Sequence, residues 1–341
     1  MSRSFRVAVV GATGLVGETM IKVLEERKFP ISELIALASN RSLGKSVEYC
    51  GRSLPVEELS SFDFSRADIG LFSAGSEVSA LYAPKAAQAG CIVIDNTAQF
   101  RYQDDIPLVV PEVNRHAIAA YRGRGIIANP NCSTIQMLVA LKPIHDAVRI
   151  ERINVATYQS VSGAGKEAVE ELASQAAALL SGRPIDPPRQ VPKQIAFNCV
   201  PHIDQFQENG YTKEEMKLLW ETRKILEDPS IRVNATAVRV PVFYGHSEAV
   251  HIETQRKISA DEARALLERA PGVTVLDRRS AGGYPTAVTE AANHDTVYVG
   301  RIREDMSHEH GLDLWIVSDN IRKGAATNSV QIAEILVSEY L

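Results

Sequence analysis

Short apolar stretches punctuate the first third of the chain, and helical or loop segments such as 78–89 separate most of them. Their Val, Ile and Leu residues run continuously and do not alternate with polar ones. This pattern is typical of strands that are covered on both faces of a parallel sheet. Six strands are predicted, at residues 5–10, 34–38, 69–72, 92–94, 108–110 and 126–128. Residues 1–132 are therefore predicted to form a doubly wound α/β domain.

The pattern changes after Cys132, where longer segments with alternating apolar and polar positions begin. Such segments are typical of strands with one face in the core, and stretches with helical spacing interrupt them. The predicted strands are 152–158, 233–242, 249–256 and 296–303, and the predicted helices are 133–147, 166–180, 213–226 and 260–269. Residues 133–324 are predicted to form an α+β domain on a larger, partly antiparallel sheet. We expect the last helix, at 325–341, to pack back on the first domain.

Composition narrows the class of protein. The chain has 341 residues, a length that favours two domains. Hydrophobic residues make up 45% and charged residues 23%, which excludes wholesale disorder. Lys and Arg number 37 and Asp and Glu number 42, so the net charge is −5. A chain with this balance is not expected to bind nucleic acid, although it can hold a local basic pocket for a phosphorylated ligand.

The four cysteines are Cys50, Cys91, Cys132 and Cys199, and no two of them form a CxxC pair. Their spacing predicts neither a disulfide framework nor a metal site, and it favours a reducing, cytoplasmic location. We expect Cys91 and Cys199 to lie inside strands as structural residues. No apolar run approaches the roughly 18–20 residues that cross a bilayer, so no membrane association is expected.

A glycine-rich segment, Gly11-Ala-Thr-Gly14-Leu-Val-Gly17, joins the first predicted strand to an amphipathic helix. Glycines let the backbone approach a pyrophosphate, and the N-terminus of the helix favours its negative charge. The segment predicts a Rossmann-type nucleotide site. Its spacing departs from the common G-x-G-x-x-G, so a tight turn without a ligand is the alternative.

The end of the second strand bears on the choice of cofactor. Sites for NAD place Asp or Glu there, to bind the ribose 2′-hydroxyl. This chain has Ser39, Arg41 and Ser42 instead. Hydroxyl and guanidinium groups suit a 2′-phosphate, so NADP(H) is the predicted cofactor. The alternative is that Arg41 is a solvated loop charge.

Cys132 falls between a predicted strand and a predicted helix, in Asn129-Pro-Asn-Cys132-Ser-Thr134. A helix N-terminus lowers the pKa of a thiol, so Cys132 is the candidate nucleophile, with an inert cysteine as the alternative. A thiolate beside a nicotinamide domain suggests a thioester that hydride transfer converts to an aldehyde. The candidate general acid or base is His246, which follows a predicted strand in a turn. His251 lies inside a predicted strand and is expected to be structural.

Motifs in matching order over nearly the whole chain resemble those of the aspartate-β-semialdehyde dehydrogenase family. They are segments 9–17, 72–75, 95–96, 107–114, 129–134, 158–165, 195–198, 214–217, 239–242, 246–248, 299–302 and 317–320. The resemblance implies an NADP-dependent, phosphate-linked interconversion of L-aspartate 4-semialdehyde and L-4-aspartyl phosphate. In the biosynthetic direction this reaction feeds the synthesis of lysine (through diaminopimelate), threonine, methionine and isoleucine.

The resemblance also implies roles for individual residues. Cys132 matches the nucleophile, His246 the acid or base, and Gln159 the group that orients the substrate. The implied substrate-binding residues are Arg101, Asn131, Gln159, Glu215, Lys217 and Arg239. The implied cofactor-binding residues are Gly11, Thr13, Gly14, Leu15, Val16, Ser39, Arg41, Ser42, Ser73, Gly75, Ser162, Gly163 and Asn320.

Two other functions stay open at this point. One is a reductase for a different acyl phosphate, such as N-acetylglutamyl phosphate, which would need a different amino-group pocket. The other is a non-catalytic protein, because the family has relatives that keep the fold but lack the cysteine, although Cys132 and His246 are both present in this chain. The resemblance further implies inorganic phosphate as a reaction partner and a homodimer built through the second domain, whose sheet has one apolar face that needs a cover.

Overall fold

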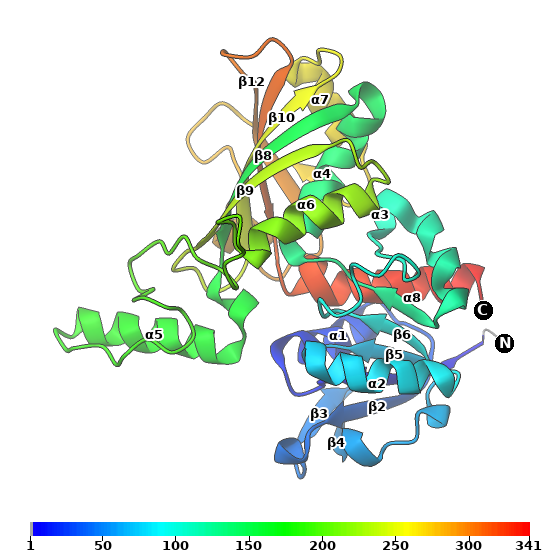
Figure 1. The fold of residues 1–341 in the computed structure, drawn as a ribbon. Helices are drawn as coiled ribbons and strands as arrows, with labels where there is room; N and C mark the ends of the chain where they lie inside the picture. The colour runs from blue at the N-terminus through cyan, green and yellow to red at the C-terminus, as the bar shows by residue number, and fades with distance from the viewer. Residues whose placement is uncertain (1–2) are drawn as a thin grey trace. The chain divides into compact units, whose positions relative to one another are not determined.

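A computed structural model describes residues 3–341, and the chain forms two compact units. The first unit comprises the chain up to Asn131 together with Ala325–Leu341, and the second comprises Cys132–Gly324. Figure 1 shows the ribbon of both units. The division falls one residue before the predicted boundary, so Cys132 belongs to the second unit.

The first unit is built on a seven-stranded sheet in the order β3-β4-β2-β1-β5-β6-β7. All neighbouring strands are parallel except β3 and β4, which form an antiparallel pair. The strands are β1 (Phe5–Val10), β2 (Ile31–Ala38), β3 (Ser46–Tyr49), β4 (Arg52–Glu58), β5 (Ile69–Phe72), β6 (Ile92–Asp95) and β7 (Ile126–Ala128). The central strands are apolar and almost wholly buried, as their continuous hydrophobic runs predict, and the doubly wound α/β class is confirmed.

The α-helices of this unit within residues 3–341 are α1 (Leu15–Glu26), α2 (Ser76–Gln88), the single turn α3 (Pro111–Asn114) and α8 (Thr327–Glu339). The C-terminal helix α8 packs against α1 and β6. Residues 108–110, predicted as a strand, form only an isolated bridge from Leu108 to Ala128. The β3–β4 hairpin was not predicted, because its segment mixes polar and apolar residues without a long regular alternation.

The second unit is built on a six-stranded sheet in the order β11-β12-β13-β10-β8-β9. Its strands are β8 (Ile150–Gln159), β9 (Arg232–Arg239), β10 (His246–Thr254), β11 (Val273–Val275), β12 (Val297–Glu304) and β13 (Gly311–Ser318). The pairs β8–β10, β10–β13 and β12–β13 are antiparallel, whereas β8–β9 and β11–β12 are parallel. The sheet is therefore mixed, as predicted, although β11 and β13 were not foreseen.

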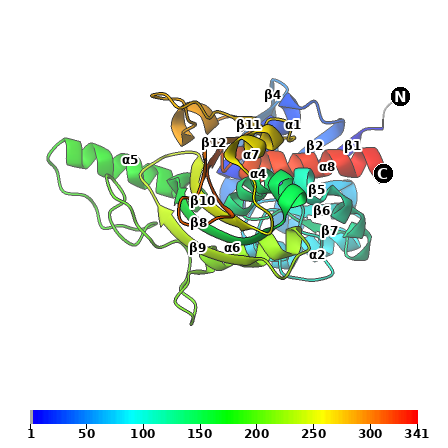
Figure 2. The ribbon, with the colours of Figure 1, turned by 90° about the horizontal axis from the view of Figure 1, so that it is seen from above.

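Helices α4 (Cys132–Val148), α6 (Lys213–Ile225) and α7 (Ala260–Leu267) pack against this sheet, and α4 contacts β8, β10, β12 and β13. Most residues of α4 are buried, because α6 and α7 also pack against it. Helix α5 (Lys166–Leu180) extends away from the sheet (Figures 1 and 2). Alternate residues of β8 and β10 are half-buried or exposed. Part of the sheet face that does not pack against α4 is therefore accessible to solvent. No helix within residues 3–341 is long and apolar enough to cross a bilayer.

Candidate active site

The turn after β1 brings one stretch of backbone close to another. Gly11 has a φ of 88°, and a Cβ atom there would lie 2.7 Å from the carbonyl oxygen of Ser73. A Cβ atom at Gly17 would lie 2.1 Å from the carbonyl oxygen of Gly11. Helix α1 begins directly after Gly14, which has no side chain with which to cap the first-turn N–H groups. These residues fit a nicotinamide dinucleotide, because the close turn and the 12-residue helix present backbone donors to a pyrophosphate.

Residues at the end of β2 lie beside this turn. The hydroxyl oxygens of Thr13 and Ser42 are 3.1 Å apart, although the two residues come from separate segments. Ser42 is buried in a short 3₁₀ turn, whereas Ser39 and Arg41 are exposed. The Ser42 hydroxyl, which the sequence assigned to a ribose phosphate, thus lies beside the glycine-rich turn, and Arg41 directly precedes it in the chain.

Arg101 and Asn131 both belong to the first unit, whereas the remaining predicted catalytic and substrate-binding residues belong to the second. The Arg101 guanidinium is 6% exposed, and its Nη2 donates to the carbonyl oxygen of Asn96 at 2.8 Å. Asn131 is buried directly before Cys132. Arg101 is therefore held in place within the nucleotide-binding unit by at least one backbone contact.

Cys132 is the first residue of α4, as the sequence predicted. Its side chain is half-buried, and the N-terminus of a helix stabilises a thiolate. The other cysteines differ. Burial raises the pKa of the Cys91 thiol to about 12, while Cys50 and Cys199 are exposed and lie outside strands. Cys91 is buried but lies directly before β6, so the expectation that Cys91 and Cys199 lie inside strands is wrong for both residues.

His246 is the first residue of β10 and is fully buried, rather than standing in an exposed turn. The backbone N–H of Ser160 donates to its Nδ1 at 3.0 Å. Nδ1 must therefore be unprotonated, which puts the proton of the neutral imidazole on Nε2. Burial and, to a lesser extent, the Arg239 charge lower the pKa of His246 to about 3, so the ring is neutral near pH 7.

Gln159 ends β8 and connects His246 to α6. Its amide nitrogen donates to Oε1 of Glu214 at 3.0 Å and lies 3.4 Å from Nε2 of His246. Its amide oxygen accepts from the hydroxyl of Thr157 at 3.2 Å. Both ends of this buried amide are therefore fixed, which gives Gln159 a single orientation beside the imidazole.

Lys217 lies one helical turn after Glu214 on α6. Its Nζ is 2.8 Å from Oε2 of Glu214 and 2.8 Å from Oδ2 of Asp204. Burial opposes the charge of Lys217, but the two carboxylates together raise its pKa above the ordinary value. The ammonium group is therefore a fixed cation at the edge of the site.

Glu215, which the sequence predicted to bind substrate, does not join this cluster. Its Oε2 accepts from the backbone N–H of Thr212 at 2.7 Å, and its Oε1 accepts from that of Ala237 at 3.0 Å. Thr212 accepts in return from the Glu215 N–H, which completes a capping box at the start of α6. The carboxylate that faces Gln159 and Lys217 is that of Glu214, one residue earlier. The pattern Thr-x-x-Glu in the sequence was the signal that could have separated the two.

Arg239 ends β9, is 6% exposed, and donates from Nη1 to the carbonyl oxygen of Ser160 at 2.8 Å. Burial lowers its pKa, whereas Glu214 and the Cys132 thiolate act in the opposite direction. A Cβ atom at Gly163 would lie 3.0 Å from Nη1 of Arg239 and 3.3 Å from Nε2 of His246, so the glycine keeps this side of both groups open.

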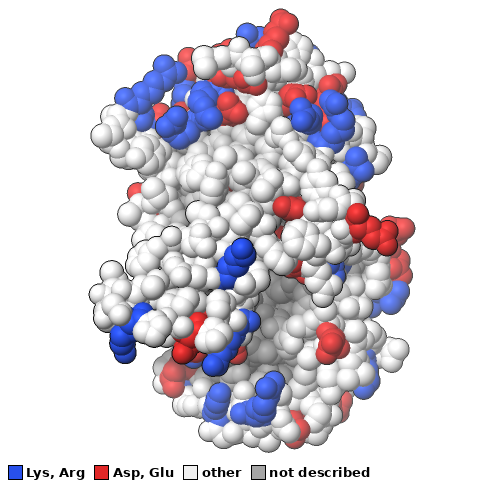
Figure 3. Space-filling view, turned by 60° about the vertical axis from the view of Figure 1, so that its left-hand side comes forward, with Lys and Arg blue, Asp and Glu red and all other residues white. Residues whose placement is uncertain are grey.

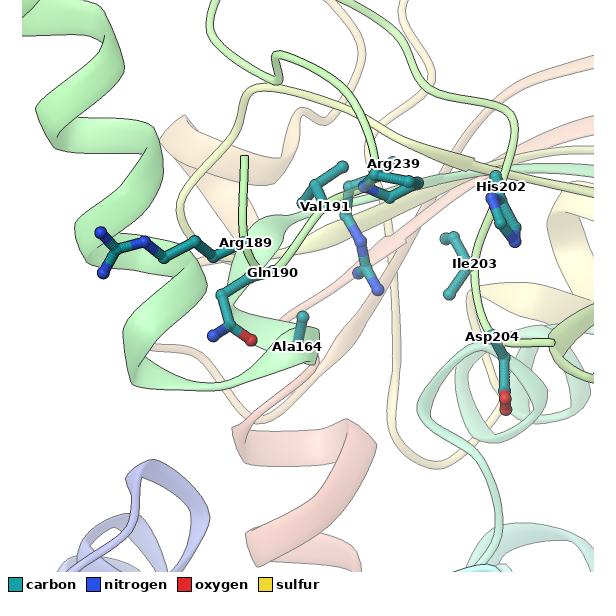
Figure 4. Close-up of a pocket in the computed structure, with 9 residues that line it drawn as sticks. Ala164, Arg189, Gln190, Val191, His202, Ile203, Asp204 and Arg239 are labelled. Atoms are coloured by element: carbon teal, nitrogen blue, oxygen red, sulfur yellow. The ribbon is translucent and has the colours of Figure 1, made fainter. Parts of the chain in front are cut away.

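Arg239 also lines a cavity of about 340 Å³ (Figure 4). The other walls come from Ala164, from the loop that carries Arg189 and Val191, and from the segment His202–Asp204. Asp204 is the residue that pairs with Lys217, so the cavity has a guanidinium on one side and an ion pair on another. Such a cavity suits a small substrate with several charged groups.

A buried polar network supports the imidazole. The side-chain oxygen of Asn320 accepts from the hydroxyls of Ser160 and Ser162, at 3.0 and 3.2 Å, and from the N–H of Gly245 at 2.9 Å. The Ser160 hydroxyl is also 3.1 Å from Nδ1 of His246. Ser162 and Asn320, which were predicted as cofactor-binding residues, therefore contact the Ser160 hydroxyl that lies beside the imidazole of His246. Ser160, which the sequence reasoning missed, is the link between them.

The chain has the features of a nicotinamide-dependent oxidoreductase. It joins a doubly wound nucleotide domain to an α+β domain whose candidate nucleophile, Cys132, lies at a helix N-terminus. Family models agree: residues 6–121 match the NAD-binding domain of semialdehyde dehydrogenases, and residues 141–323 match their dimerisation domain. The chain belongs to the semialdehyde dehydrogenase family and, within it, to the aspartate-semialdehyde dehydrogenases.

Individual relatives cover the whole chain. It is 65% identical to an aspartate-semialdehyde dehydrogenase of Legionella pneumophila, over 100% of this chain and 98% of that protein. The crystal structure of aspartate semialdehyde dehydrogenase II from Vibrio cholerae complexed with ASA has a TM-score of 0.98 and 60% identity, and 100% of both chains is covered. The enzyme of Candida albicans, solved with NADP, has a TM-score of 0.74 and 25% identity, covering 98% of each chain.

Proposed function

We propose that this protein converts L-4-aspartyl phosphate and NADPH into L-aspartate 4-semialdehyde, inorganic phosphate and NADP, reversibly, in amino-acid biosynthesis. The observation that carries the proposal is the grouping of Cys132, His246 and Arg239: Cys132 at the start of α4 interacts electrostatically with Arg239, and Arg239 and His246 both lie beside Gly163. A nucleophile, a hydrogen-bond donor and a carboxylate-binding guanidinium are the groups that this reaction needs. The names of the full-length relatives support the same reaction.

Cys132 is the covalent catalyst. Its thiolate attacks the acyl carbon, the bond from that carbon to the phosphate oxygen breaks, and inorganic phosphate leaves with the electron pair. NADPH held by the Gly11–Gly17 turn would supply a hydride, which the carbon of the Cys132 thioester would accept. The resulting oxyanion then re-forms the carbonyl group, the carbon–sulfur bond breaks, and the thiolate returns to Cys132.

His246 stabilises the oxyanion from Nε2. Because Nδ1 accepts from the backbone of Ser160, the proton on Nε2 points to the open side of the ring. A neutral imidazole in a water-excluded site is an effective hydrogen-bond donor to developing negative charge. Gln159, fixed 3.4 Å away, orients the acyl group beside it.

Substrate recognition follows from the charges around the cavity. Arg239 binds the α-carboxylate, for which a planar guanidinium is well suited. Glu214 takes the role that the sequence reasoning gave to Glu215 and binds the free amino group, which disfavours an N-acetylated substrate. Lys217, Arg101 and Asn131 bind the phosphate.

NADP(H) is the proposed cofactor rather than NAD(H). The support is the set of Ser39, Arg41 and Ser42 at the end of β2, with the Thr13 hydroxyl 3.1 Å from that of Ser42. An arginine beside hydroxyls favours a 2′-phosphate, and a carboxylate that would repel it is lacking from this turn.

We further propose a homodimer in the cytoplasm. The half-exposed face of the second sheet includes a cavity of about 360 Å³, lined by β8, β9, β10 and β13. Exposed aromatic side chains of the same unit include Phe197, Phe206, Phe243 and Tyr244. Figure 3 shows a wide area without charged side chains on the side of the molecule that carries α5. A second copy that covers such surface would bury apolar area.

One assay tests the reaction. Aspartate semialdehyde, phosphate and NADP are mixed with the enzyme, and absorbance of the reduced cofactor is followed. We expect turnover that requires phosphate, is lost with an N-acetylated semialdehyde, and is faster with NADP than with NAD. Turnover without phosphate, or equal rates with both semialdehydes, would contradict the proposal. Arg41→Ala should remove the preference for NADP and leave the rate with saturating NAD unchanged.

A further inference from the structure

Glu248 is a fully buried carboxyl group that the reaction described above does not use. It lies on β10, two residues after His246, and therefore on the same face of the strand. Its neighbours across the sheet are Thr157 on β8 and Ile316 on β13. The central strands of the sheet thus enclose Glu248 from both sides.

Helix α4 packs against β10, and both elements are labelled in Figures 1 and 2. Gln136 and Ser133 of α4 are the side chains that face the carboxyl. Ser133 directly follows Cys132, and Gln136 is one turn further along. The Glu248 side chain therefore lies at the contact between β10, which begins with His246, and α4, which begins with Cys132.

The carboxyl and the amide of Gln136 lack a conventional hydrogen bond. Within residues 3–341 neither oxygen of Glu248, nor either polar atom of the Gln136 amide, has a partner in hydrogen-bond geometry. Burial raises the pKa of Glu248 well above its ordinary value, against the weaker lowering effects of Gln136 and Ser133. A neutral carboxyl can donate to the amide oxygen and accept from the amide nitrogen, so the two groups are complementary.

A buried polar pair of this kind adds little to stability, because apolar residues of similar volume often replace it without loss. A hydrogen bond between the carboxyl and the amide would instead fix a distance that apolar contacts leave free. We propose that Glu248 is a positioning residue whose carboxyl, through Gln136 and Ser133, holds the first turn of α4 in place and so sets Cys132 relative to His246.

The proposal rests on Cys132 as the nucleophile, and three variants of the full-length enzyme test it. Glu248→Gln keeps a neutral group that can pair with Gln136. Glu248→Met keeps the length of the side chain and removes its polar atoms. Thr254→Val is the matched control, because it removes a buried hydroxyl on the same face of the same strand, at its far end.

Two readouts are needed. The first is kcat and KM for aspartate semialdehyde and NADP. The second is the rate at which iodoacetamide alkylates Cys132 as a function of pH, with the Cys132 peptide quantified by mass spectrometry because Cys50 and Cys199 are also exposed. A purely structural role would change the unfolding temperature without moving the pH midpoint of alkylation.

We expect Glu248→Met to lower kcat by about 10- to 100-fold, since misplacement of a reacting group by about 1 Å has effects of this size. Its KM for NADP should change less than about twofold, and its alkylation midpoint should shift. Glu248→Gln should keep kcat within about threefold of the parent and the same midpoint, and Thr254→Val should do likewise.

Two results would overturn the inference. In the first, Glu248→Met behaves as Thr254→Val does. In the second, Glu248→Gln is as impaired as Glu248→Met, which would mean that the proton or the charge of the acid is required. If the parent enzyme does not turn over aspartate semialdehyde, the proposed function fails, but the alkylation midpoints still report on Glu248.

Discussion

Replacement of Glu248 by Gln should stabilise the protein, and the gain should grow with pH. In the unfolded chain this carboxyl ionises near the ordinary value of 4.5, whereas burial in the fold raises its pKa well above that value. Below pH 4.5 both states are protonated, and the group has no effect on the pH dependence of unfolding. As the pH rises above 4.5 the unfolded state loses the proton first, so the parent loses stability.

The magnitude follows from this linkage. Each pH unit above 4.5, up to the raised pKa, removes about 1.4 kcal/mol from the free energy of unfolding of the parent. Glu248→Gln has no proton to lose and escapes this loss. The difference between the two proteins should therefore rise by nearly 3 kcal/mol from pH 5 to pH 7 if the group stays protonated in the fold.

Urea unfolding at a fixed protein concentration measures this difference, because the midpoint of the proposed dimer would depend on concentration. Parent, Glu248→Gln and Thr254→Val are compared at several values of pH between 4.5 and 8. The control variant should show an offset that does not change with pH. A constant offset for Glu248→Gln would refute the reasoning, since it would mean that Glu248 ionises in the folded protein as it does in the unfolded chain.

Three further predictions concern the site itself. Cys132→Ala should abolish turnover and keep NADPH binding, measured by fluorescence titration; residual thioester-dependent turnover would assign the nucleophile elsewhere. His246→Asn should lower kcat about 10²–10⁴-fold. Because the pKa of His246 is about 3, the plot of kcat against pH for the parent should show no ionisation of this ring near pH 6.5. An ionisation near pH 6.5 that disappears in the variant would contradict the buried neutral imidazole. Glu214→Gln should raise KM for aspartate semialdehyde at least about tenfold. Glu215→Gln should leave KM unchanged and lower the free energy of unfolding in urea by about 1 kcal/mol. The reverse pattern would show that Glu215, and not Glu214, binds the substrate.

The fold was largely predictable because hydrophobic patterns report burial directly. The strands of the first unit are continuous apolar runs, and their positions match the sequence prediction at β1 and β5 within the bounds of the structure. The segment 108–110 has the same composition, but tertiary packing leaves it a single bridge to Ala128. Composition shows that a segment is buried, and pairing depends on neighbours that a single segment does not reveal.

The site was less predictable, because it depends on which way side chains face. Cys132 could be proposed as the nucleophile from its place before a helix, and His246 as its partner from the chemistry that a thioester requires. The choice between Glu214 and Glu215 depends on where α6 begins, and the capping box of Glu215 with Thr212 favours Glu214 for the proposed substrate site. The contact of Ser160 with His246 joins residues 86 positions apart, which no local pattern encodes.

The donor that fixes the tautomer of His246 is a main-chain group, and this affects how the site tolerates change over evolution. A site in which an aspartate orients the imidazole loses that control by one substitution of the aspartate. Here every amino acid at position 160 except proline supplies the same N–H to Nδ1. The backbone therefore sets the orientation of the imidazole. Substitutions at position 160 can change the neighbouring hydroxyl groups while Nε2 remains the protonated nitrogen of His246.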